Sequence, residues 1–136
     1  MSKASKTMTA TACHCGSGLA FAACCEPYLL GLAIAPTAEA LMRSRYSAYV
    51  CSNEAYLQNT WDERTRPREK LSHDEPTQWL GLEVRKHQSV GDQATVEFVA
   101  RYKIGGRAQR LHEVSRFVRH EGRWYYVDGV FPKTAK

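Results

Sequence analysis

Residues 96–106, VEFVARYKIGG, place apolar side chains at every second position and end on a glycine pair. Alternation with a period of two is typical of a β-strand that buries one face, and a Gly-Gly pair favours the tight turn of a hairpin. The same alternation occupies residues 79–85, and further strands are expected over 107–119 and 123–128. The C-terminal half of the chain is therefore predicted to be an antiparallel meander.

The preceding residues follow a helical period instead. Thr37 is expected to cap a helix that runs to about Val50, and Ser52 to cap a shorter one that runs to Trp61. Residues 62–77 are densely charged and contain two prolines, which predicts an excursion over the surface. Helices followed by antiparallel strands predict an α+β fold, with the helices packed on one face of a curved sheet.

The composition limits the class of protein. With 136 residues, of which 43% are hydrophobic, the chain is expected to form one compact domain with a small appendage. A chain of this size can bury about two-thirds of its unfolded surface, so it needs no disulfide framework. The longest apolar run, residues 28–35, is interrupted by Gly31 and is too short to span a bilayer, which argues against a membrane protein.

The basic residues are concentrated in one stretch. Residues 101–123 hold seven Lys and Arg against two Glu, an excess equal to the net charge of +5 of the whole chain. Such a stretch favours anionic partners such as RNA, ribosomes or acidic protein surfaces. The other interpretation is that arginine supplies the polar outward faces of strands, since no arginine-rich or aromatic-interleaved motif accompanies the charge.

Four of the five cysteines fall within 13 residues, in the pattern C-x-C-G-S-G-x5-C-C. Four thiolates can close a tetrahedral zinc site, and zinc would replace the core that so short a segment lacks; iron also suits four sulfurs. The odd number and the crowding argue against a secreted disulfide scaffold, so we expect a cytoplasmic protein with reduced thiols. The predicted metal ligands are Cys13, Cys15, Cys24 and Cys25.

The residues around this cluster are given lesser roles. Residues 1–12 have no apolar periodicity and are expected to form a disordered tail. His14, between two ligands, is expected to point outward, and Cys51, alone at a helix end, is expected to be a small buried side chain. A disulfide pair or unused thiols are the alternatives to a metal site.

The cysteine pattern resembles the SEC-C motif, the metal knuckle at the tail of the SecA translocation ATPase. The order of the later segments resembles the YchJ-like family of SEC-C proteins. The resemblance implies a metal knuckle over residues 13–31 and a domain of the nuclear-transport-factor-2-like cone fold over residues 32–136. The segments that carry it are CCEPYLLG at 24–31, LMRSRYSA at 41–48, WLGL at 79–82, SRF at 115–117 and WYYVDG at 124–129.

A two-residue turn before the last strand would place Phe117 opposite Tyr126 and Ser115 opposite Asp128, on one face of the sheet. The cone fold implied by the resemblance has a cavity between helix and sheet. Enzymes of that fold, such as ketosteroid isomerases and scytalone dehydratase, use carboxylates and tyrosines there for proton transfer. The residues expected to line the cavity are Arg45, Tyr46, Tyr49, Glu113, Ser115, Phe117 and Tyr126.

Two carboxylates are candidates for a general base in such a cavity. Glu113 or Asp128 would take the proton, with Tyr46 or Tyr49 donating to an oxyanion. Our preferred interpretation is structural: Glu113 is expected to neutralise one of two arginines of the preceding helix, Arg43 or Arg45, in a buried ion pair. No catalytic residue is therefore assigned.

The predicted function is a non-enzymatic, metal-binding docking or adaptor module of the bacterial cytoplasm. Protein or ribosome contact through the knuckle is expected by analogy, because the knuckle of SecA docks a chaperone and ribosomes. One alternative is a small-molecule binder, or an isomerase-like or dehydratase-like enzyme, that uses the cone cavity. The other is a metal or redox sensor that uses the thiolates.

Overall fold

The computed structural model describes residues 11–67 and 77–132. Its C-terminal half is one antiparallel sheet in the order β1-β2-β3-β4, formed by Thr77–Val90, Gln93–Ile104, Arg107–His120 and Arg123–Val130. A 3₁₀ turn, η1, and helices α2, α3 and α4 precede the sheet at Phe21–Ala23, Glu26–Leu29, Ala38–Val50 and Glu54–Asn59. The predicted α+β class and meander are confirmed. Most of the predicted N-terminal tail and the middle of the charged excursion lie outside the described residues, at 1–10 and 68–76.

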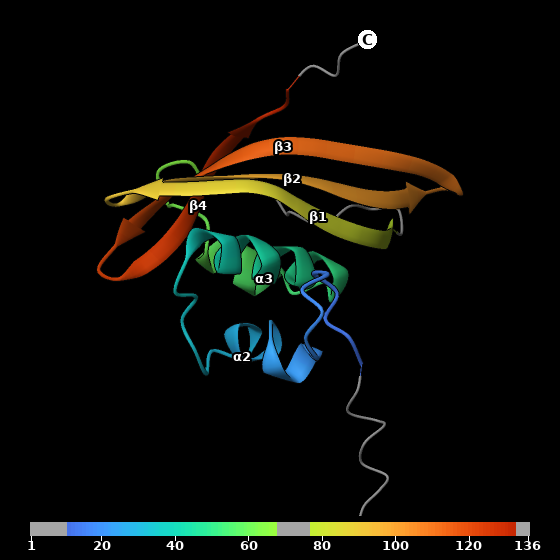
Figure 1. Cartoon of the computed structure of the whole chain (residues 1–136), viewed down its shortest axis with the longest axis horizontal. Helices are drawn as coiled ribbons and strands as arrows, with labels where there is room; N and C mark the ends of the chain where they lie inside the picture. Colours follow the sequence, from blue (N-terminus) through green and yellow to red (C-terminus); the bar gives the residue numbers. More distant parts are fainter. Residues whose placement is uncertain (1–10, 68–76, 133–136) are drawn as a thin grey trace, which may run out of the picture.

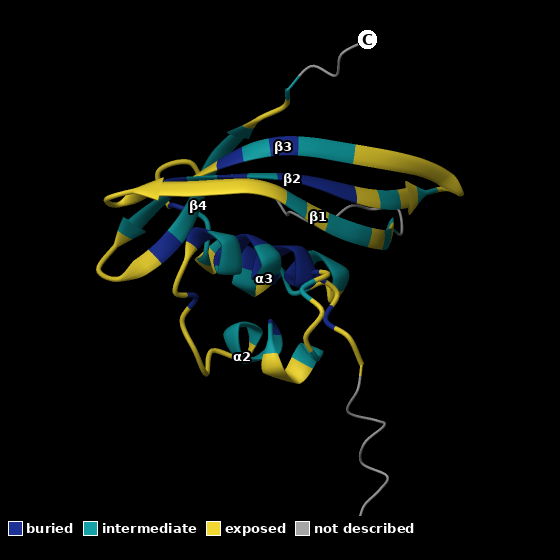
Figure 2. Ribbon diagram, in the orientation of Figure 1, coloured by how far each residue is buried: buried dark blue, intermediate teal, exposed yellow. Residues whose placement is uncertain are grey.

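The elements form three layers (Figure 1). The curved sheet lies over α3, α2 lies on the far side of that helix, and the cysteine loop lies beside the helix and reaches β1. Buried residues gather where α3 faces the sheet (Figure 2), and the largest fully buried side chains are Phe117, Val96 and Val99 of the two central strands. No helix among the described residues is long and apolar enough to cross a membrane.

Capping side chains decide where the two longer helices begin. The hydroxyl of Thr37 accepts a hydrogen bond from the backbone N–H of Ala40 at 3.0 Å, so Thr37 caps α3 as predicted. The cap of α4 is Asn53 and not Ser52, because the Asn53 side chain accepts from the backbone N–H of Tyr56 at 3.1 Å. Ser52 has a φ of +59° and belongs to the left-handed turn that follows α3.

The pairing of β3 with β4 contains a bulge that the sequence analysis missed. Phe117 pairs with Tyr126 as predicted, but the next pair is Arg116 with Asp128, so β4 carries one extra residue. One extra residue reverses the alternation of the side chains that follow it. The prediction that Asp128 lies opposite Ser115 on the inner face is therefore wrong.

Candidate metal centre and cone cavity

A tight loop positions the first two cysteines. Ala12 pairs with Ala20, which closes the loop at its base. Gly16, inside the loop, has a φ of +78°, and a Cβ at this position would lie 3.0 Å from the carbonyl oxygen of Leu82 in β1. Glycine therefore permits both the left-handed turn and the close approach of the loop to the sheet.

The four cysteines predicted as ligands form one cluster. Their sulfur atoms all lie within 4.8 Å of one another, with 3.7 Å between Cys15 and Cys24 and 4.0 Å between Cys24 and Cys25. A tetrahedron with zinc–sulfur bonds of about 2.3 Å has sulfur–sulfur edges of about 3.8 Å. The cysteines form no disulfide, and the cluster could hold a metal ion. Zinc and iron both fit four sulfurs in this arrangement.

Contacts to α3 anchor the cluster on the main domain. Three of the four cysteines are buried, and the sulfur of Cys13 lies 3.7 Å from the hydroxyl of Ser47, which is itself fully buried in α3. One turn earlier in the helix, Nη1 of Arg43 donates to the backbone carbonyl of Cys15 at 2.8 Å. The knuckle, residues 13–31, is thereby fixed to one side of α3.

The thiols of the cluster differ in pKa. A hydrogen bond from Cys25, with a further one from Ser17, lowers the pKa of the Cys15 thiol. Burial raises the pKa of Cys24, and the hydrogen bond to Cys15 together with burial raises the pKa of Cys25. A bound cation stabilises thiolates, so metal binding is expected to release the protons that Cys24 and Cys25 otherwise keep.

Two further residues of metal-binding types, His14 and Cys51, lie outside the cluster. His14 is exposed, as predicted, and its ring packs against Phe21 with 5.3 Å between the centroids. The prediction that Cys51 is buried is wrong, since Cys51 caps the C-terminus of α3 and is exposed. The physical reason is the left-handed turn at Ser52, which begins directly after Cys51 and leads the chain away from the core.

A cavity of about 310 Å³ lies between α3 and the inner face of the sheet; we call it the cone cavity. Six of the seven residues expected to line it surround it, namely Arg45, Tyr46, Tyr49, Glu113, Ser115 and Tyr126. The sequence analysis missed the other walls, which are Met42, Trp61, Trp79, Phe98, Ala100, Tyr102 and Leu111. These residues come from α3, the segment after α4, and strands β1, β2 and β3, which only the fold brings together.

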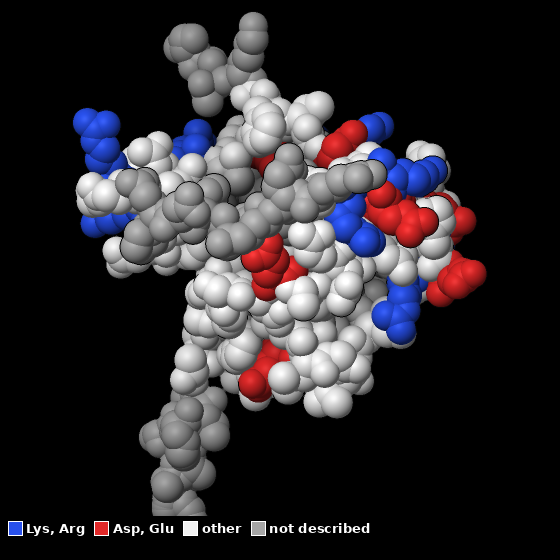
Figure 3. All heavy atoms as spheres, turned by 180° about the vertical axis from the view of Figure 1, so that it is seen from behind, with Lys and Arg blue, Asp and Glu red and all other residues white. Residues whose placement is uncertain are grey.

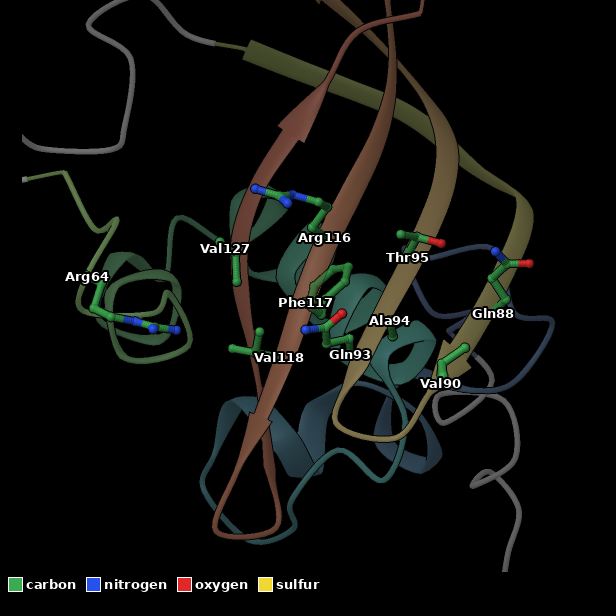
Figure 4. A pocket seen from close by; sticks show the side chains of 10 residues that line it. All are labelled: Arg64, Gln88, Val90, Gln93, Ala94, Thr95, Arg116, Phe117, Val118 and Val127. Atoms are coloured by element: carbon green, nitrogen blue, oxygen red, sulfur yellow. The ribbon is translucent and has the colours of Figure 1, made fainter.

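The remaining two candidates lie elsewhere. Phe117 lines a separate depression of about 260 Å³, formed by side chains of all four strands and of the segment after α4 (Figure 4). Asp128 pairs with Arg116 at 2.6 Å, and both side chains are roughly half-exposed on the outer face. Asp128 is therefore not in a position to act as a base in the cone cavity.

Glu113 pairs with neither Arg45 nor Arg43, so the buried ion pair predicted from the sequence does not form. Nη1 of Arg45 donates to a carbonyl at the end of α4 and to a hydroxyl just after it, at 2.9 and 2.7 Å. The last carbonyls of a helix lack partners within the helix, which makes them strong acceptors for such a donor. Glu113 accepts instead from the hydroxyls of Ser115 and Tyr126, at 2.7 and 2.8 Å. Burial lowers the pKa of Arg45.

Comparison with known families gives a match for each of the two parts of the chain. The SEC-C motif matches residues 11–27, and the family described as "YchJ, middle NTF2-like domain" matches residues 37–129. This chain belongs to the YchJ-like family. The resemblance inferred from the sequence is confirmed. The domain that contains the sheet is NTF2-like, where NTF2 stands for nuclear transport factor 2.

Relatives and solved structures agree with this membership. The chain is 55% identical over 130 residues to a UPF0225 protein of Ralstonia nicotianae, covering 87% of this chain and 90% of that one. The solution structure of a SEC-C motif containing protein from Rhodopseudomonas palustris has a TM-score of 0.80 at 38% identity, over 89% of this chain and 98% of that one. A crystal structure from Psychrobacter arcticus has a TM-score of 0.75 at 29% identity, over 94% of this chain and 86% of that one.

Sequence reasoning also missed the residues that attach the knuckle to this NTF2-like domain. Arg43 and Ser47 are four positions apart, so they lie on the same face of α3. That spacing was available in the sequence. The partner could not be read from the sequence, because only the tertiary fold brings the cysteine loop to this face.

Proposed function

We propose that this YchJ-like protein is a metal-stabilised adaptor, in which the knuckle binds a partner protein and the NTF2-like domain carries the knuckle. The observation that carries the proposal is a closed four-sulfur cluster next to exposed apolar side chains. Zinc is the proposed ion, since four thiolates are the usual ligands of structural zinc sites.

The donor set favours a structural role for the metal. Catalytic zinc sites keep one coordination position for water or substrate, whereas structural sites use four protein ligands. Four cysteines within reach of one ion would fill every position of a tetrahedron. A metal held in this way shapes the surrounding chain, and a segment as short as the knuckle needs such a cross-link to keep one conformation.

Apolar side chains next to the cluster supply a surface for a partner. Leu30, Leu32 and Ile34 follow α2 and are 63%, 77% and 51% exposed. Two of these residues, Leu30 and Ile34, also line a groove of about 340 Å³ that extends to Tyr56 and Trp124. Exposed apolar patches beside a groove are typical of protein interaction sites. We name residues 30–34 the apolar segment.

The charge distribution favours a protein as the partner of the knuckle. Figure 3 shows few charged side chains over the lower part of the molecule, where the knuckle lies, whereas Lys and Arg lie at both ends of the sheet, mixed with Asp and Glu at one end but not at the β2–β3 hairpin. RNA would be attracted to that hairpin and not to the apolar segment. A ribosome would therefore meet the knuckle through one of its proteins.

Metal content is the first measurement, on untagged protein purified without oxygen or chelator. About one zinc ion per chain is expected, lost in a Cys24→Ser, Cys25→Ser variant. Zinc is also expected to dissociate as the pH falls, because protons compete for the sulfurs. Iron in place of zinc would favour a sensor based on the thiolates, and protein without any metal would contradict the proposal.

The role of the apolar segment is tested by capture experiments with a matched pair of variants. Leu32→Glu places a carboxylate in the segment, and Val90→Glu places one on an equally exposed apolar residue of β1, where Val90 is 81% exposed. A partner that the wild type and Val90→Glu both retain, but Leu32→Glu loses, supports the proposal. Equal retention by both variants would mean that the segment is not the binding surface.

A further inference from the structure

Arg45 brings a buried positive charge to the cone cavity. Its side chain is 3% exposed, and Cζ lies 5.2 and 4.7 Å from the ring centroids of Trp61 and Tyr126. Nη1 is occupied by the Leu57 carbonyl and the Thr60 hydroxyl. Nε and Nη2 have no hydrogen-bond partner within residues 11–67 and 77–132, so their N–H groups are available on the edges of the guanidinium that α4 does not bind.

Glu113 brings a negative charge to the same cavity. Its side chain is 7% exposed, and Oε2 accepts both hydrogen bonds that the carboxylate receives within the described part of the chain, from Ser115 and Tyr126. Oε1 receives none from the described residues. Tyr126 therefore contacts both charges, Arg45 through its ring and Glu113 through its hydroxyl. Each charged group retains hydrogen-bonding capacity that its neighbours in the protein do not use.

Aromatic rings form much of the rest of the wall. The ring of Trp79 lies 5.5, 5.8 and 5.3 Å, centroid to centroid, from those of Tyr46, Tyr49 and Tyr102. An apolar cavity of about 150 Å³ is large enough for benzene. The cone cavity, at about 310 Å³, therefore has room for one aromatic ring with a short polar chain.

We infer that the cone cavity binds a compact aromatic compound that carries a carboxylate together with an ammonium or hydroxyl group. The carboxylate would accept hydrogen bonds from Nε and Nη2 of Arg45, and the ammonium or hydroxyl group would donate to Oε1 of Glu113. The ring would pack against Trp79 and its tyrosine neighbours. A ligand with only one of the two polar groups would leave the unused N–H groups of Arg45, or Oε1 of Glu113, without a hydrogen-bond partner from the ligand, which lowers affinity.

Four probes that share a phenyl ring separate these contributions. Phenylalanine carries both charged groups, phenylacetate only the carboxylate, phenethylamine only the ammonium, and benzyl alcohol only a hydroxyl. Binding is followed by tryptophan fluorescence, to which Trp61 and Trp79 contribute, and by the amide resonances of inner-face residues such as Ala100. Phenylalanine is expected to bind at least about tenfold more tightly than each of the other three. Equal binding of benzyl alcohol, or no response to phenylalanine at about 10 mM, would overturn the inference.

A matched pair of carboxylate variants locates the binding. Glu113→Gln is expected to weaken phenylalanine about tenfold, to the level of phenylacetate. Glu97→Gln removes a carboxylate that pairs with His112 at 2.7 Å and does not line the cavity, so it should change nothing. Equal effects of the two variants would contradict the inference.

A second variant tests the other end of the cavity and serves if Glu113→Gln does not fold. Arg45→Lys keeps the positive charge but loses the planar donor edge. It is expected to weaken phenylacetate and phenylalanine several-fold and to leave phenethylamine unchanged. A uniform loss across all probes would indicate a collapsed cavity, and an unchanged affinity for the carboxylates would rule out the assigned role of Arg45.

Discussion

Gly129 leaves the space that the Glu113 side chain occupies beside the cone cavity. Gly129 pairs with Ser115 on the inner face of the sheet, and a Cβ at position 129 would overlap the side chain of Glu113, coming within 2.7 Å of its Cγ. The absence of a side chain is therefore what allows the Glu113 carboxylate to reach the hydroxyls of Ser115 and Tyr126. Glycine is needed at position 129 because it leaves room for Glu113. It is not needed for the backbone conformation, since its φ is not in the left-handed region.

The first prediction is that Gly129→Ala displaces Glu113 and lowers the free energy of unfolding by about 1–3 kcal/mol, the usual effect of overpacking a core. Urea unfolding at neutral pH measures the loss. Gly81→Ala in β1 is the matched control, because a Cβ there meets nothing within 4 Å. Equal stability of the two variants would show that Glu113 moves aside without cost.

At the scale of elements, the edge strand β4 is held by the segment that follows α4. Trp61 pairs with Tyr126 in parallel fashion, and the next residue, Asp62, donates its backbone N–H to the Tyr126 carbonyl at 2.7 Å. The Asp62 carboxylate, 4% exposed, accepts two hydrogen bonds from the Arg64 guanidinium, at 3.1 and 3.0 Å. This pairing covers part of a sheet edge that would otherwise present open hydrogen-bonding groups.

The second prediction concerns the pH dependence of this connection. The hydrogen bonds from Arg64 hold the pKa of Asp62 well below its usual range. A carboxyl whose pKa is lower in the folded state stabilises the fold above the unfolded pKa of about 3.9, and this contribution is lost as the pH falls further. The free energy of unfolding of wild type should therefore exceed that of Asp62→Asn at neutral pH and approach it below about pH 4.

Asp92→Asn is the control for that titration. Asp92 also pairs with an arginine, Arg119, at 3.0 Å, but its side chain is 73% exposed. Exposed pairs contribute little, so this variant should follow the wild-type pH profile throughout. If Asp62→Asn follows it as well, the Asp62–Arg64 pair does not stabilise the edge of the sheet.

For the whole molecule, α3 is the layer that connects the two sites. One side of the helix carries Arg43 and Ser47, which contact the cysteine cluster, and the other carries Arg45 and Tyr49, which line the cone cavity. The knuckle has no apolar core of its own, and its cysteines pack into the core of the main domain. Loss of the metal should therefore loosen the knuckle first and leave the sheet in place.

The third prediction tests this hierarchy by amide hydrogen exchange on metal-loaded and chelator-treated protein. Removal of the metal is expected to speed exchange throughout residues 11–31 and to leave the central strands β2 and β3 protected. The Cys24→Ser, Cys25→Ser variant should behave like the stripped protein. Simultaneous loss of protection in knuckle and sheet would mean that the metal stabilises one cooperative unit, and that the two layers are not separate.

Local patterns in the sequence were enough to predict the four strands, α3 and the cysteine cluster, but not η1 or α2. The period of two, the glycine turns and the cap at Thr37 act over a few neighbouring residues, so β1 to β4 and α3 could be predicted from the chain alone. The four cysteines also lie within 13 residues. The loop between them is short enough that any compact fold brings their sulfurs close.

Only the tertiary structure decided what the distant residues do. The bulge in β4 pairs Asp128 with Arg116 and Gly129 with Ser115, which turns Asp128 away from the cavity. Arg45 donates to a carbonyl of α4 and does not pair with Glu113. Trp79 of β1 and Tyr102 of β2 both line the cone cavity, which could not be predicted from either strand alone. Such contacts depend on the geometry of the assembled layers, because the possible partners of each side chain are distant in sequence and come within reach only in the tertiary structure.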